Sequence, residues 1–160
     1  MRKIFAFLLT FIMALSTTCV AFAGEMPAPS NTYPAKYEYF DDGSYMVTTI
    51  TESSSILTRA SGSKTASKTS TYHSGSGSAL WSVTVTGSFS YTGSSAKCTS
   101  SSVSANSYSS LWKINSKSAS KSGATAKATA KAYQYDSNGK YITSVTKTVG
   151  LTCSINGNLS

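Results

Sequence analysis

A strict two-residue alternation between residues 124 and 135 most constrains how this chain can fold. Every second position up to residue 132 is an alanine, namely Ala124, Ala126, Ala128, Ala130 and Ala132. Alanine and lysine are strong helix formers, but on a helix these alanines would fall on two opposite sides and form no apolar stripe. On a strand they all share one face. The pattern therefore predicts a β-strand.

Asn138-Gly139, just after this segment, is a strong signal for a two-residue hairpin loop. With that loop, the alanines face the large apolar residues of segment 141–153. The pairs are Ala132 with Val145, Ala128 with Val149, Ala126 with Leu151 and Thr129 with Thr148. Lys147 then lies opposite Ala130 on the apolar face, where we expect either a bulge or a side chain that snorkels out at a sheet edge.

Other segments also read as strands. We expect a hairpin over residues 37–51 with its turn at 41–44, and a long strand over 80–91, in which apolar residues alternate with serine and threonine. Further strands are expected around 64–72, around Cys98 and over 112–118. Six to eight short strands without a convincing helix predict an all-β antiparallel sandwich. Four aromatic residues are expected to fill the space above the alanines: Trp81, Phe89, Tyr91 and Trp112.

The first 23 residues have the pattern of a secretory signal peptide. Arg2-Lys3 precedes the apolar run 4–15, which is too short to span a bilayer, and Ala21-Phe22-Ala23 supplies a cleavage site. We therefore expect a secreted, extracellular protein that can stay with the cell wall, with no transmembrane segment after signal removal.

Charge is unevenly distributed along the rest of the chain. Residues 24–58 hold one lysine and five acidic residues, whereas residues 59–160 hold Arg59 and ten lysines against Asp136 alone. We expect three parts after the signal peptide: a flexible leader that carries all three prolines (24–36), an acidic hairpin segment (37–55) and a basic β-sandwich domain (56–160). A body this basic should attract polyanions.

Cys98 and Cys153 are the two cysteines beyond the expected signal peptide. An isolated pair in an exported chain most simply forms a disulfide. The bond would close a loop of about 55 residues and contribute roughly 4 kcal/mol on the chain-entropy model. The alternative is a pair of buried, reduced thiols.

No group of residues has the pattern of a catalytic or metal site, so we expect a non-enzymatic protein without a cofactor. His73 is the only histidine, and it has few possible partners for a metal. Asp41 and Asp42 are the only close pair of carboxylates, and a turn accounts for both.

The outer face of the alanine strand is the candidate binding surface. It offers Lys127, Lys131, Tyr133 and Tyr135, and Lys113 and Lys117 near Trp112 could extend it. Ammonium groups pair with phosphate or sulfate, and aromatic rings stack on sugars or bases. The alternative is an ordinary solvated face whose lysines discourage edge-to-edge pairing.

Several motifs together resemble a family of small exported proteins from Gram-positive bacteria, over Ser61 through Leu159. They are the SGSKT start, the Leu-Trp-x-Val strand ending Phe-Ser-Tyr-Thr-Gly, Cys98, the SKSASKSG segment and the KTVGLTCS-x-Asn-Gly ending. The resemblance implies secretion, a β fold and paired cysteines, and it supplies no catalytic residues.

We therefore expect a secreted β-sandwich that associates with anionic cell-envelope polymers, polysaccharides or other extracellular polyanions, and with no specific nucleic acid. The alternative is a small bacteriocin- or toxin-like protein, since small secreted β-sandwich bacteriocins are similar in size and in the expected architecture. Growth inhibition by the purified chain would distinguish the two.

Overall fold

The structure, a computed structural model, describes residues 33–58 and 61–160, without the side chains of 54–58. The expected signal peptide and residues 24–32 of the leader lie outside this range. Contacts divide the chain into two units, Met1–Ser30 and Asn31–Ser160, and every described residue belongs to the second.

The described residues form eight β-strands. They are β1 (Lys36–Tyr39), β2 (Tyr45–Thr58), β3 (Ser61–His73), β4 (Ala79–Tyr91), β5 (Ala96–Ser107), β6 (Trp112–Ser122), β7 (Thr125–Tyr135) and β8 (Tyr141–Thr152). Several are longer than the short strands we expected, and β2 has 14 residues. In this part of the chain, no helix has the length and apolar character needed to cross a membrane.

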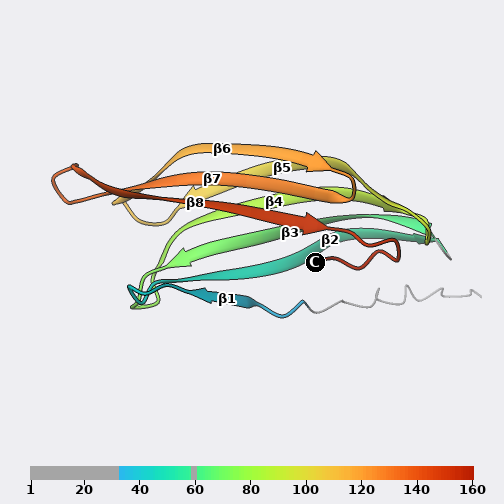
Figure 1. Ribbon diagram of the computed structural model, residues 1–160, viewed down its shortest axis with the longest axis horizontal. Coiled ribbons are helices and arrows are strands. Elements are labelled where there is room, and N and C mark those ends of the chain that lie inside the picture. Colours follow the sequence, from blue (N-terminus) through green and yellow to red (C-terminus); the bar gives the residue numbers. More distant parts are fainter. Residues whose placement is uncertain (1–32, 59–60) are drawn as a thin grey trace, which may run out of the picture. The chain divides into compact units, whose positions relative to one another are not determined.

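The strands form two antiparallel sheets that face each other, which confirms the predicted β-sandwich (Figure 1). The larger sheet has the order β1-β2-β3-β4-β5 and the smaller one the order β6-β7-β8. Within each sheet, strands that follow one another in sequence pair as in a meander, and the chain passes from one sheet to the other between β5 and β6. β2 runs across residues 55 and 56, where we expected the acidic segment to give way to the basic domain, and pairs with β3 on both sides of that point.

β7 and β8 pair in the register that the alternation predicted. Ala132 pairs with Val145, Ala128 with Val149, Ala126 with Leu151 and Thr129 with Thr148. Small side chains therefore lie beside large ones on the inner face, and threonines lie side by side on the outer face.

The loop of this hairpin differs from the predicted two-residue turn. It contains Ser137, Asn138 and Gly139, and the Asp136 N–H donates to the Lys140 carbonyl at 2.9 Å. Only Gly139 of these takes a positive φ, of 80°. A three-residue loop shifts the pairing by one position, and a bulge at Ile142 between the pairs Tyr135–Tyr141 and Gln134–Thr143 restores it.

The core lies between β4 and the alanines of β7. Of the large inward residues of β4, Trp81, Val83, Val85 and Phe89 are at most 1 % exposed, and Ala126, Ala128 and Ala132 of β7 are fully buried. Large side chains therefore fill the space left by small ones, as predicted. Trp112 lies on β6, in the same sheet as the alanines, and stacks on Trp81 with ring centroids 6.5 Å apart.

Gly87 brings the two sheets close together at the centre of β4. A Cβ atom there would lie 2.6 Å from Cζ of Phe89 and 2.8 Å from Cβ of Ala126. The nearby bulge lies on the neighbouring strand β5, where Thr99 is left out between two paired positions. The glycine therefore serves close packing.

The larger sheet extends beyond the smaller one on the side of β1 and β2. Contacts between the sheets are made chiefly by β3, β4 and β5 with β6, β7 and β8. β8 is an edge strand, and Lys147 lies opposite Ala130 without a bulge at that position. Its side chain reaches outward to the Glu38 carboxylate on β1. The edge position thus accounts for a lysine on the apolar face.

Candidate functional site

Five of the six lysines and tyrosines proposed for binding lie on the outer face of the smaller sheet. Along β7, Lys127, Lys131, Tyr133 and Tyr135 alternate with the buried alanines and point away from the core. Lys113 on β6 pairs with Tyr133, so its side chain lies on the same face.

Contacts between cations and aromatic rings order the half of this face nearest the β7–β8 loop. Nζ of Lys131 lies 5.2 Å from the centroid of the Tyr133 ring, and Nζ of Lys113 lies 5.1 Å from that of Tyr135. Tyr141 packs edge-on against both tyrosines, with centroid distances of 5.4 and 6.3 Å. We call these residues, with Lys127, the Lys/Tyr face: Lys113, Lys127, Lys131, Tyr133, Tyr135 and Tyr141.

Tyr141 was not among the candidates, and the predicted two-residue loop would pair it with Asp136, on the inner face with Val145. Three-residue loops are the next most common hairpin connection, and such a loop pairs Tyr141 with Tyr135. The side chain is 51 % exposed, so its ring edge remains open to a ligand.

Lys117 does not join the Lys/Tyr face. A register shift on β6 leaves Asn115 unpaired between Ile114 and Ser116. Each residue after this bulge therefore changes face, and Lys117 pairs with the inward Ala130 instead of an outward residue of β7. It remains exposed because β6 is an edge strand.

Threonines lie between the lysines on this face and pair across β7 and β8. The hydroxyls of Thr125 and Thr152 are 2.9 Å apart, and those of Thr129 and Thr148 are 2.8 Å apart. Each pair uses one hydroxyl proton internally, which leaves the other hydroxyl proton free to donate to a ligand or to water.

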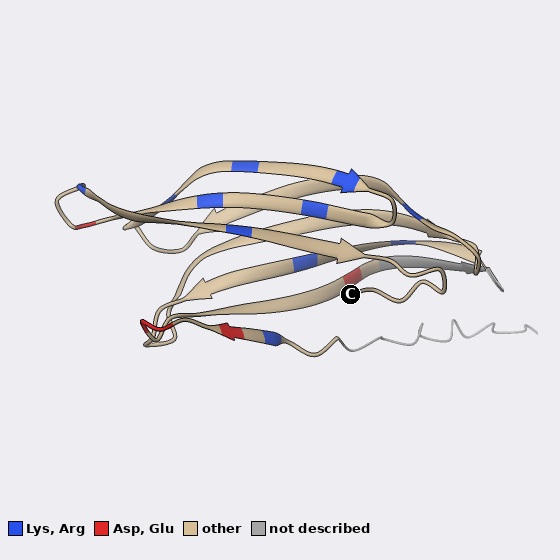
Figure 2. Cartoon of the chain, viewed as in Figure 1, with Lys and Arg blue, Asp and Glu red and all other residues tan. Residues whose placement is uncertain are grey.

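Acidic residues are largely absent from the smaller sheet. Figure 2 shows basic residues along β6, β7 and β8, and acidic residues in β1, β2 and the turn between them. From residue 112 onward the lysines are Lys113, Lys117, Lys121, Lys127, Lys131, Lys140 and Lys147, against Asp136. Asp136 caps the hairpin loop by accepting hydrogen bonds from the N–H groups of Asn138 and Lys140. The Lys/Tyr face therefore presents unneutralised positive charge.

A second exposed group of aromatic residues, which we did not anticipate, lies on the outer face of the larger sheet. The rings of Tyr37 and Tyr39 stack with centroids 6.3 Å apart, and Tyr45 stacks on His73 at 4.9 Å. Nδ1 of His73 is 3.0 Å from the Gly77 carbonyl and donates to it. Cross-strand packing that stabilises the edge hairpin accounts for this group.

The expected disulfide between Cys98 and Cys153 is absent from the structure, where both cysteines are buried free thiols. Cys98 lies on β5 of the larger sheet, and Cys153 follows β8 of the smaller one. Their N–H groups donate to Gly123 and Ala124 at 2.8 and 3.0 Å, so they approach the same turn from different strands without bonding. Burial raises the pKa of both thiols, which makes each a poor nucleophile at neutral pH.

Among the residues that the structure describes, no three His, Cys, Asp or Glu side chains come together as metal ligands would. Comparisons with protein-family models, with curated proteins and with solved structures found no match to this chain.

Proposed function

We propose that this chain is a secreted, non-enzymatic binding protein whose Lys/Tyr face associates with anionic polymers of the cell envelope or with other extracellular polyanions. The observation that carries the proposal is the grouping of three lysines and three tyrosines on one sheet face that holds no carboxylate.

The chemistry of the face suits a repeating anionic ligand. Each ammonium group can pair with one phosphate, sulfate or carboxylate group, and an open sheet face lets several such pairs form along one extended chain. The tyrosine rings supply apolar contact area with a polar edge, which suits sugar rings that carry hydroxyl groups. Several weak contacts acting together give useful affinity without an enclosed pocket.

Sedimentation of the purified chain with isolated cell walls over a salt series tests this proposal. We expect the chain to sediment at low salt and to be released as ionic strength rises, because exposed charges are screened over roughly 8 Å at 0.15 M salt. Binding that is absent at low salt, or that does not change with salt, would contradict the proposal.

A double lysine variant and its control test whether the Lys/Tyr face is the binding surface. Lys127→Gln combined with Lys131→Gln should weaken sedimentation severalfold, because it removes two of the three ammonium groups. Lys97→Gln combined with Lys117→Gln is the matched control, since both are exposed lysines outside the Lys/Tyr face. Equal losses in the double variant and in the control would show that net charge alone, and not this face, drives association.

A further inference from the structure

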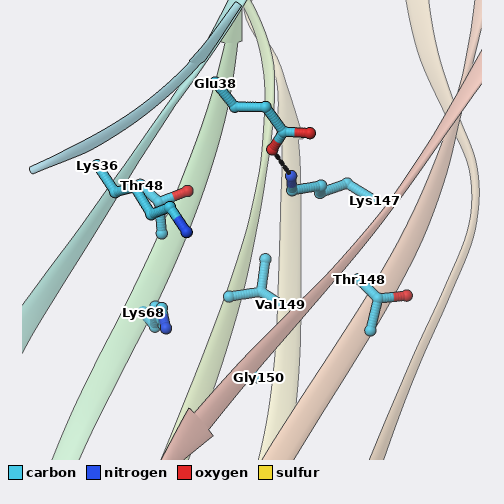
Figure 3. Close-up of a pocket in the computed structure, with 8 residues that line it drawn as sticks. All are labelled: Lys36, Glu38, Thr48, Lys68, Lys147, Thr148, Val149 and Gly150. Atoms are coloured by element: carbon cyan, nitrogen blue, oxygen red, sulfur yellow. Dashed lines mark hydrogen bonds and ion pairs between the residues drawn. The ribbon is translucent and has the colours of Figure 1, made fainter. Parts of the chain in front are cut away.

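The part of the larger sheet that extends past β8 forms one wall of a groove (Figure 3). The groove has a volume of about 210 Å³, several times the roughly 30 Å³ that a water molecule occupies. Its lining comes from β1, β2, β3 and β8 and comprises Lys36, Glu38, Thr48, Lys68, Lys147, Thr148, Val149 and Gly150. Three ammonium groups and one carboxylate therefore share this space.

Lys64 and Lys147, both on the inner side of the sandwich, each have a carboxylate partner. Nζ of Lys64, which is buried on β3, lies 3.2 Å from Oε2 of Glu52. Lys147 pairs with Glu38 across the groove, and this ion pair is the one interaction drawn in Figure 3. Such pairing is expected, because removing an ammonium group from water without a partner is costly.

Lys68 is the exception to this pairing of inward lysines with carboxylates. It is half-buried on β3, four residues after Lys64, and its neighbours across the strands are Ile50 and Val85. Among the described residues, no carboxylate lies within ion-pair distance of Lys68 or of Lys36. Burial lowers the pKa of Lys68, and the charge of nearby Lys36 lowers it further. Two positive groups therefore meet at the groove without a counter-charge.

We propose that the groove binds a tetrahedral oxyanion, a phosphate or sulfate group, between Lys36 and Lys68. Such an ion supplies the missing negative charge and has oxygen atoms for both ammonium groups at once. Glu38 does not oppose binding strongly, because Lys147 neutralises it. β8 adds backbone donors, since an edge strand leaves alternate N–H groups unpaired. The site shares no residue with the Lys/Tyr face and stands independently of it.

Titration of the purified chain with inorganic phosphate at constant ionic strength, followed by calorimetry and by melting temperature, tests the proposal. Saturable binding and a rising melting temperature are expected with phosphate and sulfate, but not with chloride. A glycerol phosphate oligomer distinguishes the source of the group. Equal affinity per phosphate indicates a free ion, and tighter binding of the oligomer indicates a polymer lying along the groove.

Lys68→Met separates a binding site from a chance cluster of charges. Without phosphate the variant should melt higher than the wild type, because it lacks the unpaired ammonium group. Its affinity for phosphate should fall by about tenfold or more, as expected for the loss of one charge-assisted hydrogen bond. Lys97→Met makes the same change at an exposed lysine on the outer side of the larger sheet, outside both the groove and the Lys/Tyr face, and should leave phosphate binding unchanged.

Three results would overturn this inference. They are the absence of saturable binding of phosphate and sulfate by the wild type, undiminished phosphate affinity in Lys68→Met, and an equal loss in Lys97→Met.

Discussion

At the scale of single residues, the alanines of β7 show why side-chain size matters more here than helix propensity. Ala126, Ala128 and Ala132 are fully buried and belong to the same core as Trp81 and Phe89. A larger residue at these positions would have to displace neighbouring core side chains. The small side chains therefore set the distance between the sheets.

Replacing Ala128 with leucine should destabilise the fold by roughly 1–3 kcal/mol, because the core has no space for three more carbon atoms. Thr129→Leu is the matched control. Thr129 is the next residue along the strand, but its side chain lies on the outer face, where its hydroxyl contacts Thr148. Urea unfolding measures both, and equal losses of stability would contradict the assignment of the two faces.

At the scale of secondary structure, the β7–β8 hairpin reaches the predicted register by an unexpected route. The loop has one residue more than predicted, and the bulge at Ile142 compensates for it. Burial of the alanine face decides the register, because a slip of one residue would expose every alanine of β7. Loop geometry then adapts to the register that the sheet requires.

The loop type can be tested with two neighbouring substitutions. Gly139→Ala should cost about 1–2 kcal/mol, since Gly139 has a φ of 80°, which an L-residue with a Cβ adopts only with strain. Asn138→Ala should be nearly neutral, because Asn138 has no positive φ. A two-residue Asn-Gly turn would require positive φ at both positions, so a large cost at Asn138 in urea unfolding would restore the original prediction.

Three details show how far the sequence predicts the elements and the site. Alternation predicts which residues of β7 face the core, because burial imposes a period of two on an entire strand. It does not predict the bulge at Asn115, which moves Lys117 to the other face, since nothing in the local pattern marks the extra residue. Nor does it predict that Trp112 lies in the same sheet as the alanines, because periodicity does not say which sheet a strand joins.

At the scale of the whole sandwich, a five-stranded sheet packs against a three-stranded one. This difference in size determines where charged side chains can lie on the inner side. The inner side of β1 and β2 extends past the smaller sheet, so charged residues can occupy inward positions there and remain partly solvated. Glu38, Lys36 and Lys147 all lie in this region. Glu38 and Lys147 form an ion pair, whereas Lys36 has no ion-pair partner among the described residues. The groove is therefore a consequence of the sheet sizes, and its chemistry depends on which lysines lack partners.

The difference in stability between the wild type and Lys68→Met should depend on pH. Folding lowers the pKa of Lys68 below its ordinary value of 10.5, because burial and Lys36 disfavour the charged form. Between the folded pKa and 10.5, the unfolded chain binds more protons than the folded chain, so stability rises with pH. Below that window both states are protonated, and the cost of the unpaired charge is constant.

In phosphate-free buffer, Lys68→Met should therefore be more stable than the wild type by a fixed amount near neutral pH. This advantage should shrink as pH rises toward 10.5. Taking the difference between the two proteins cancels groups that titrate alike in both, and urea unfolding at several pH values measures it. An advantage that grows with alkaline pH would show that Lys68 gains a negatively charged partner on folding. In that case Lys68 is already neutralised and is not available to bind an anion.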